Sequence, residues 1–208
     1  MSLFITFEGG EGTGKSVQTR ALYRRLSKLA IPVVLTQEPG GTNFGRKIAR
    51  QLKWAEIKDI SPLAELMLFN ASRAQLVTEV IKPGLKKGKV VICDRYADST
   101  TAYQGYGRGL DLAMVAAVNS AATHGVKPDL TVLLDVPVEA GLIRKKTARR
   151  DRFEREALAF HHRVHEGYLK LAAKEPERWL VVDATQNKKI TAQVIWQRVS
   201  ELLSQRGF

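Results

Sequence analysis

The sequence LFITFEGGEGTGKS at residues 3–16 decides the fold of this chain. Its first part, Leu3–Glu8, is a short apolar and β-branched run, which predicts a buried strand. Its second part, Gly9–Ser16, matches the pattern G-x-x-x-x-G-K-[ST] and leads into Gly14–Ala30, where apolar residues recur with helical spacing. A strand, a glycine-rich loop of this spacing and a helix, in this order, predict a loop that binds phosphate groups.

The loop supplies the groups that bind a triphosphate and its metal ion: backbone N–H groups, a lysine and a hydroxyl. It consists of Gly9, Gly10, Glu11, Gly12, Thr13, Gly14, Lys15 and Ser16. Its glycines allow backbone N–H groups to form a concave nest at the positive end of the following helix. Lys15 is expected to reach the β- and γ-phosphates of a nucleoside triphosphate, and the Ser16 hydroxyl to ligate Mg²⁺. The alternative, a glycine-rich surface turn that binds nothing, leaves the flanking strand and helix unexplained.

The rest of the chain alternates between short apolar runs and longer segments of helical period. The predicted strands are Leu3–Glu8, Pro32–Thr36, Lys89–Cys93, Leu130–Asp135 and Trp179–Asp183. The predicted helices are Gly14–Ala30, Pro62–Ile81 (expected to stop before Pro83-Gly84), Leu110–Thr123, Val138–Thr147, Glu154–Ala173 and Ile190–Gln205. This alternation predicts a three-layer α/β fold of the P-loop type, with a five-stranded parallel sheet flanked by helices on both faces. No repeat or linker divides the sequence, so residues 1–208 are expected to form a single domain.

Composition narrows the class of protein and its location. Of the 208 residues, 44% are hydrophobic and 26% are charged, which is typical of a globular protein that needs no disulfides. The chain has one cysteine, Cys93, and its N-terminus has neither a basic segment nor a long apolar run. We therefore expect a cytoplasmic protein that does not associate with a membrane.

The net charge of +12 attracts polyanions, and nucleic acid is one of them. A nucleic-acid-dependent ATPase is therefore one alternative function. However, the densest basic segment, residues 144–152, is short, and aromatic residues do not alternate with its charges as they do in a nucleic-acid groove. We expect no nucleic-acid partner.

Asp94 and Arg95 follow the third predicted strand directly. Because the carboxyl ends of parallel strands meet at one edge of the sheet, Asp94 is expected near the loop, where it could hold Mg²⁺ together with Ser16. The guanidinium of Arg95 suits an incoming phosphate. The alternative is a purely structural ion pair at the end of the strand.

Several motifs in register resemble the bacterial thymidylate kinases, which are P-loop nucleoside monophosphate kinases. These motifs are Glu11 in the loop, Glu38–Thr42 (EPGGT), Asp94–Tyr96 (DRY) and Tyr103–Gly109 (YQGYGRG). The resemblance runs from about Phe4 to Gln186, which is nearly the whole chain. It implies transfer of the γ-phosphoryl group of ATP to dTMP, with Mg²⁺ as cofactor, by a homodimer.

The resemblance also implies which residues hold dTMP. They are Glu11, Pro39, Phe69, Arg73, Arg95, Thr100, Tyr103 and Gln104. Phe69 would stack on the thymine and Arg73, on the same face of the predicted helix, would contact it, while Pro39 would close the far side of the base. The sequence alone is equally consistent with Phe69 as a core residue and Arg73 as a solvated charge.

The remaining members of this set would contact the base edge, the sugar and the phosphate. Thr100 and Gln104 resemble polar contacts to the edge of the thymine. Tyr103 resembles a ring that crowds the 2′ position of the sugar and so favours deoxyribose. Glu11 resembles an acceptor for the 3′-hydroxyl.

Residues 144–154 resemble the lid that closes over the phosphates in this family. In one subgroup a catalytic arginine lies in the phosphate loop, and in the other it lies in the lid. Because the loop here has no arginine, the resemblance implies a lid arginine, with Arg149 as first choice and Arg150 and Arg152 as alternatives. The basic run is also consistent with a solvated helix end.

Three further features leave alternatives open. Gln37 stands where bacterial members commonly have arginine, which puts the affinity for the acceptor phosphate in doubt. A deoxynucleoside kinase would need a base for the 5′-hydroxyl, and Glu38 is the obvious candidate. His161, His162 and His165 lack the pattern of a zinc site and are predicted to lie on an ordinary polar helix face, whereas Cys93 is predicted to lie in the core.

Overall fold

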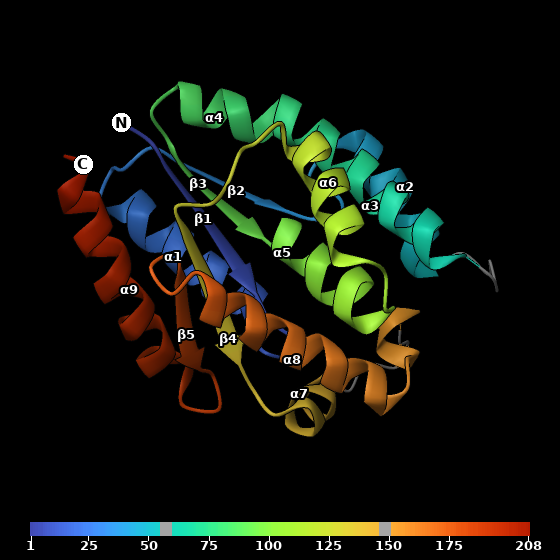
Figure 1. The fold of residues 1–208 in the computed structure, drawn as a ribbon. Coiled ribbons are helices and arrows are strands. Elements are labelled where there is room, and N and C mark those ends of the chain that lie inside the picture. Colours follow the sequence, from blue (N-terminus) through green and yellow to red (C-terminus); the bar gives the residue numbers. More distant parts are fainter. Residues whose placement is uncertain (55–59, 146–150) are drawn as a thin grey trace.

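The computed structural model of the protein describes residues 1–54, 60–145 and 151–208. A five-stranded sheet forms its centre, with strand order β2-β3-β1-β4-β5 and parallel pairing throughout (Figure 1). The strands are β1 (Leu3–Glu8), β2 (Val33–Gln37), β3 (Val90–Asp94), β4 (Leu130–Asp135) and β5 (Trp179–Asp183). The sheet confirms the predicted fold class and places each predicted strand within one residue of its expected bounds.

Helices cover both faces of the sheet, so the fold has three layers. One face carries α1 (Lys15–Lys28) and α9 (Lys188–Gln205), which pack against each other and against the strands. The opposite face carries α3 (Pro62–Leu76), α4 (Lys82–Lys86), α5 (Ala97–Thr100), α6 (Leu112–Thr123) and α8 (Leu158–Lys174). Helix α2 (Asn43–Trp54) packs on α3, and α7 (Val138–Arg144) packs on α8.

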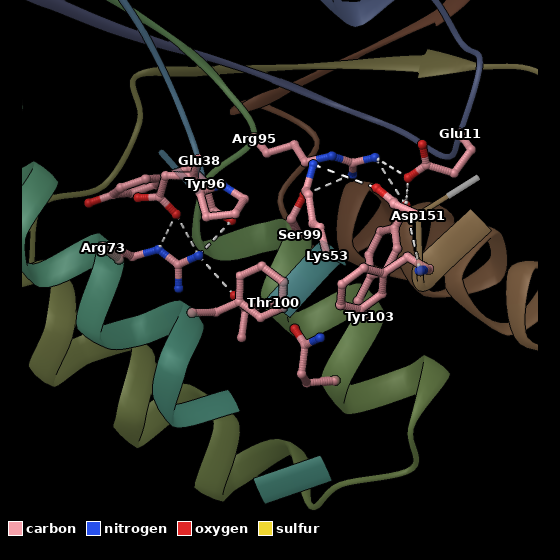
Figure 2. A pocket seen from close by; sticks show the side chains of 14 residues that line it. Glu11, Glu38, Lys53, Arg73, Arg95, Tyr96, Ser99, Thr100, Tyr103 and Asp151 are labelled. Carbon is pink, nitrogen blue, oxygen red and sulfur yellow. Dashed lines mark hydrogen bonds and ion pairs between the residues drawn. The ribbon is translucent and has the colours of Figure 1, made fainter. Parts of the chain in front are cut away.

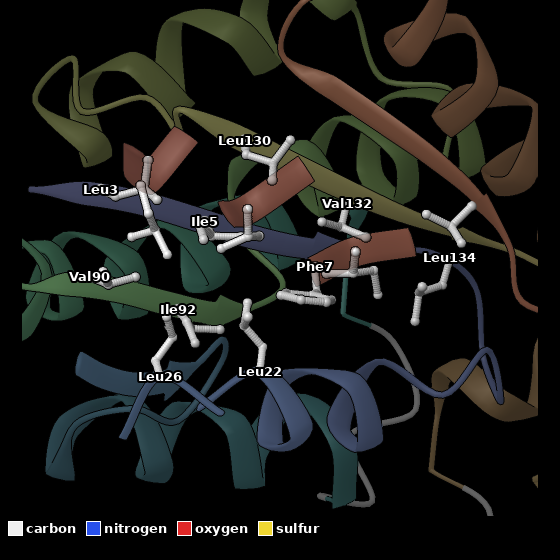
Figure 3. Close-up of a cluster of buried hydrophobic side chains, with 14 of the residues drawn as sticks. Leu3, Ile5, Phe7, Leu22, Leu26, Val90, Ile92, Leu130, Val132 and Leu134 are labelled. Carbon is white, nitrogen blue, oxygen red and sulfur yellow. The ribbon is translucent and has the colours of Figure 1, made fainter. Parts of the chain in front are cut away.

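Alternate residues of the central strand face the two helical layers. Leu3, Ile5 and Phe7 join a cluster that includes Leu22 and Leu26 of α1 (Figure 3). Phe4 lies in a different cluster, with residues of β3 and of the α3 side. Burial on both faces explains why the strands read as continuous apolar runs.

One helix boundary was predicted wrongly at Pro83. The helix that begins at Pro62 does not stop there, because a π-helical segment at Val77–Ile81 connects α3 to α4, which contains Pro83 and Gly84. Proline is tolerated in the first turn of α4, where an N–H group needs no partner within the helix. Gly84 allows a close approach to β3, since a Cβ atom there would lie 2.9 Å from Val91 Cγ2.

Other helix boundaries also differ from the prediction. Helix α8 begins at Leu158 rather than Glu154, because Phe153–Arg155 forms a separate 3₁₀ turn. Helix α7 ends at Arg144, and the predicted extension through Thr147 falls partly outside the described residues. The sequence prediction omitted α2, α5 and the π-helical segment Thr101–Gly107. Among the described residues, no helix is both long enough and apolar enough to cross a membrane.

Candidate functional site

The phosphate loop joins β1 to α1 at the carboxyl end of the sheet. Gly9, Gly12 and Gly14 all have positive φ, a conformation that favours glycine and turns successive N–H groups toward one side. The Lys15 Nζ atom folds back on the loop and donates to the carbonyl of Gly9 at 3.0 Å and that of Gly10 at 2.6 Å. Burial lowers the pKa of Lys15 to about 7. A phosphate would restore the favourable environment for its positive charge.

Asp94 lies beside the loop, as predicted. Because β3 is the neighbour of β1 in the sheet, the last residue of β3 reaches the first turn of α1. The Ser16 hydroxyl donates to Asp94 Oδ2 at 2.6 Å. The oxygens of a hydroxyl and a carboxylate are hard ligands of the kind that Mg²⁺ prefers. The pair therefore fits a Mg²⁺ ion that takes its remaining ligands from phosphate and water. Among the described residues, no group of three or more His, Cys, Asp or Glu could hold a metal ion by itself.

One pocket, which we call the acceptor pocket, lies beside the phosphate loop and has about 460 Å³ of empty space, part of it open to solvent (Figure 2). The structure brings together in its lining all the residues that the resemblance assigned to dTMP: Glu11, Pro39, Phe69, Arg73, Arg95, Thr100, Tyr103 and Gln104. They come from the loop, the end of β2, α3, the end of β3, α5 and the following π-helical segment. Residues distant in sequence therefore converge on one cavity.

Arg95 links this pocket to the phosphate loop. Its backbone φ is +70°, in the left-handed region that is uncommon for residues other than glycine. Its guanidinium donates to the carbonyl of Gly9 and to Glu11 Oε1 at 2.8 Å. It also contacts the hydroxyls of Ser99, Tyr103 and Tyr168. A strained backbone conformation such as this positive φ, in a residue that lines a pocket, is typical of functional residues.

Glu11 is surrounded by positive charge. It forms ion pairs with Arg95 and Lys145, and it accepts a hydrogen bond from the Tyr103 hydroxyl at 2.9 Å. Burial opposes its ionisation, but Arg95, Lys15 and Lys145 together hold the pKa of Glu11 well below its ordinary value. Glu11 is therefore a carboxylate at the boundary between the loop and the acceptor pocket.

Arg73 is buried rather than solvated, which rules out one of the alternatives that the sequence left open. Its side chain is 1% exposed and pairs with Glu38 Oε2 at 2.7 Å. The same guanidinium donates to Asn70, Asn119, Thr100 and the carbonyl of Tyr96. Phe69 is only partly buried, and its ring lies 5.6 Å from that of Phe153. Both side chains therefore build the wall of the pocket.

The structure describes the segment that resembles a lid only at its two ends, and the lid itself stays a prediction. Lys145 forms ion pairs with Glu11 and with Glu154, and so joins both ends of the segment to the loop. Arg152 pairs with Glu65 and donates to the carbonyl of Leu52, so it is engaged on the α2–α3 side. Arg149 and Arg150 lie outside the described residues.

The sequence did not assign to the dTMP site several residues that line the acceptor pocket: Glu38, which was considered only as the base of a nucleoside kinase, Lys53, Tyr96, Ser99, Asp151 and Phe153. Glu38 and Tyr96 stood within quoted motifs, and Asp151 and Phe153 within the predicted lid, so a signal existed for these four. Lys53 comes from α2, which was not predicted, and no motif pointed to Ser99.

The three histidines of α8 do not form one polar face, so that prediction was wrong. His161 is 5% exposed, and its Nε2 has no hydrogen-bond partner among the described residues. His165 contacts Asp135 at 2.7 Å, and His162 contacts Glu139 at 3.0 Å. Helix α8 turns its His161 side toward the phosphate loop and α7, which leaves this ring inside the protein. Cys93 is fully buried, as predicted.

Acidification is expected to destabilise the protein through His161. Burial lowers the pKa of His161 below its ordinary value. Below about pH 6.5 the unfolded chain therefore binds a proton that the native state resists, and the free energy of unfolding falls with pH. Urea unfolding between about pH 7.5 and 5.5 would measure this, and His161→Gln should flatten the dependence. His124→Asn, at the end of α6, is the control; equal slopes for wild type and His161→Gln would contradict the prediction.

Another pocket, which we call the donor pocket, is formed by the loop, Asp94 and Arg144 and adjoins the acceptor pocket. The two share Glu11, Glu38, Pro39, Lys53 and Arg95. A phosphate loop that opens directly onto a second ligand pocket is the arrangement of a P-loop kinase, in which a triphosphate donor meets a phosphate acceptor.

Comparisons with known proteins narrow this class. Residues 7–195 match the family model described as thymidylate kinase. The chain is 58% identical over 203 residues to the thymidylate kinase of Dehalococcoides mccartyi (strain ATCC BAA-2266 / KCTC 15142 / 195), covering 98% of each chain. It is 47% identical to that of Roseiflexus sp. (strain RS-1), covering 98% of this chain and 96% of the relative. The crystal structure of thymidylate kinase from Ehrlichia chaffeensis superposes with a TM-score of 0.80 at 33% identity, covering 95% of this chain and 98% of that one. The chain belongs to the thymidylate kinase family.

Proposed function

We propose that ATP binds on the phosphate loop, that dTMP binds in the acceptor pocket, and that the phosphoryl group passes between them beside Arg95. As a thymidylate kinase, the protein transfers the γ-phosphoryl group of ATP to dTMP, which gives dTDP and ADP. The observation that carries the assignment of the two substrates is the shared boundary of the two pockets, which includes Arg95 and Glu11. The deoxynucleoside kinase and nucleic-acid-dependent ATPase alternatives are not favoured.

The proposed mechanism depends on position and charge. Lys15 neutralises the β- and γ-phosphates, and Arg95 holds the acceptor phosphate in line with them. We propose Arg149 of the lid as the further cation over the transferred group. The phosphate of dTMP is already a nucleophilic oxyanion, so no strong general base is needed. Glu38, the candidate base of a nucleoside kinase, is instead paired with Arg73.

The assignment is tested by measuring ADP release from ATP and Mg²⁺ with a panel of acceptors. Turnover with dTMP well above that with dCMP or AMP is expected. Turnover with thymidine but not with dTMP would overturn the proposal in favour of a nucleoside kinase. ATP hydrolysis that depends on added nucleic acid rather than on a nucleotide acceptor would overturn it as well.

We propose that Ser16 and Asp94 hold Mg²⁺, which would supply positive charge to the phosphates of ATP. Asp94→Asn removes the anionic ligand but keeps the shape of the side chain. We expect kcat to fall roughly 10²-fold and the Mg²⁺ concentration needed for half-maximal activity to rise. Asp111→Asn, at the start of α6, is the matched control. An unchanged Mg²⁺ requirement in Asp94→Asn would show that the metal lies elsewhere.

We propose that two chains associate through α3 and α6. Leu63, Met67 and Ala71 recur on one exposed stripe of α3, and Leu112 is exposed on α6, which packs beside α3. An exposed apolar stripe across two adjacent helices is typical of a homodimer interface. By contrast, Leu66 and Leu76 of α3 are buried within the chain.

A charge in this stripe is expected to separate the dimer. Met67 is 48% exposed, and Met67→Glu would place a carboxylate inside the interface, where its desolvation opposes association. Analytical ultracentrifugation should then show a dimer for wild type and a monomer for the variant. Ile190→Glu, at a 50% exposed position on α9, is the control and should stay dimeric. A monomeric wild type would contradict the proposal.

We also propose that residues 1–208 form a single domain and that the protein works in the cytoplasm. The support for a single domain is that one sheet joins the first strand to the last and that both pockets lie at one edge of this sheet.

A further inference from the structure

Glu65 of α3 is a buried carboxylate for which the phosphoryl transfer gives no role. Its side chain is 0% exposed, and three described side chains, those of Gln104, Arg108 and Arg152, donate hydrogen bonds to its carboxylate. The Nε2 atom of Gln104 donates to its Oε1 at 2.7 Å. Arg108 donates to it at 3.2 Å, and Arg152 forms an ion pair with it. The two guanidiniums offset the cost of burying its charge.

This contact fixes the orientation of the Gln104 amide. An ionised carboxylate accepts hydrogen bonds and donates none, so only the –NH₂ end of the amide can face Glu65. Gln104 is 1% exposed and lines the acceptor pocket. The carbonyl oxygen, Oε1, is therefore turned away from Glu65 and is the hydrogen-bond acceptor that the amide can offer to a ligand in this pocket.

A carbonyl oxygen at this position distinguishes two classes of pyrimidine. Thymine and uracil carry a hydrogen on N3 and can donate it to Oε1. Cytosine carries a lone pair on N3, which would face the lone pairs of Oε1 and leave both groups without a partner. Sites that are built to pair with a polar group of the substrate discriminate strongly against analogues that leave that group unpaired.

We propose that Glu65 is a specificity-determining positioning residue, which selects pyrimidines with an N3–H group by holding the Gln104 amide with Oε1 toward the base. Glu65 does not touch the substrate and acts through Gln104. The proposal rests on the proposed function, because it requires the base to lie in the acceptor pocket beside Gln104.

The test is the ratio of kcat/KM for dTMP to that for dCMP. In Glu65→Gln, the new amide can donate to Gln104, so the Gln104 amide can turn over and present its –NH₂ end to cytosine N3. We expect the ratio to fall by about tenfold or more. A role in stability alone would change kcat/KM for both substrates together and leave the ratio intact.

If the Glu65→Gln protein does not fold, a double variant that loses one charge of each sign can be tested in its place, together with a matched control. Glu65→Gln combined with Arg108→Gln removes one charge of each sign, and Arg108→Gln alone is its matched control. The ratio should fall in the double variant and stay near the wild-type value in the control. Equal ratios in these two proteins would overturn the proposal.

A third variant separates this inference from the function on which it rests. Gln104→Met removes the amide and should abolish the discrimination between dTMP and dCMP whatever Glu65 does. If Gln104→Met lowers the ratio but the Glu65 variants do not, Glu65 is not the positioning residue. If Gln104→Met leaves the ratio unchanged, Gln104 does not read the base and the inference fails, whereas the proposed function fails only if dTMP is not an acceptor.

Discussion

Replacing Arg95 with alanine is expected to lower kcat/KM for dTMP by about 10³-fold, which is the scale on which arginines contribute to phosphoryl transfer. Its guanidinium bridges the loop carbonyl of Gly9, the carboxylate of Glu11 and the acceptor pocket. Loss of this side chain removes a cation that lines both pockets. Among the described residues, Lys145 and Lys15 would still hold positive charge beside the buried Glu11 carboxylate.

The measurement is steady-state kinetics with each substrate varied in turn. For Arg95→Ala we expect most of the loss in kcat and in KM for dTMP, with KM for ATP little changed. Arg25→Ala is the matched control, because Arg25 lies on α1 over the ring of Trp196, away from both pockets. Thermal unfolding should be recorded for both variants. A loss confined to KM for ATP would place Arg95 on the donor side and contradict the prediction.

Lys15→Met is expected to lower kcat by about 10³-fold as well, but through the donor. Lys15 contacts the carbonyls of Gly9 and Gly10, so its ammonium lies at the centre of the loop where the phosphates are proposed to bind. Methionine keeps the length and the apolar stem while it removes the charge. The fold should tolerate this change, since burial already disfavours the ammonium.

The binding of each nucleotide separates this variant from Arg95→Ala. Titration calorimetry should show weakened ATP binding in Lys15→Met and dTMP binding close to that of wild type. Lys28→Met, in the last turn of α1, is the control for loss of a lysine from the same helix. Wild-type kcat in Lys15→Met would remove the loop lysine from the mechanism.

The sheet and the phosphate loop could be predicted because their signals are local. The strands β1, β4 and β5 have the predicted bounds, since strands covered on both faces are continuously apolar. The loop pattern follows from the conformations that glycine permits. The boundary at Pro83 could not be predicted, because a π-helical segment shifts the hydrogen bonding before the proline and carries no clear sequence signal.

The site was predictable where a motif names a residue and unpredictable where tertiary packing assigns its partner. The resemblance placed Phe69 and Arg73 in one pocket correctly, but the sequence could not show that Arg73 is buried with Glu38. The burial of His161 likewise depends on how α8 packs against the phosphate loop. Ser99 reaches the pocket through the short helix α5, which has too few residues for a periodic pattern.

The shared boundary of the two pockets has a consequence for inhibitor design. Because Glu11 and Arg95 border both cavities, the two substrates are neighbours on one continuous surface. A single compound that joins a pyrimidine nucleoside to an adenosine polyphosphate would make the contacts of both substrates. It would lose translational and rotational freedom once, whereas two separate ligands lose it twice. The stretch of such a compound that passes Arg95 and Glu11 would set the length and the charge of its linker.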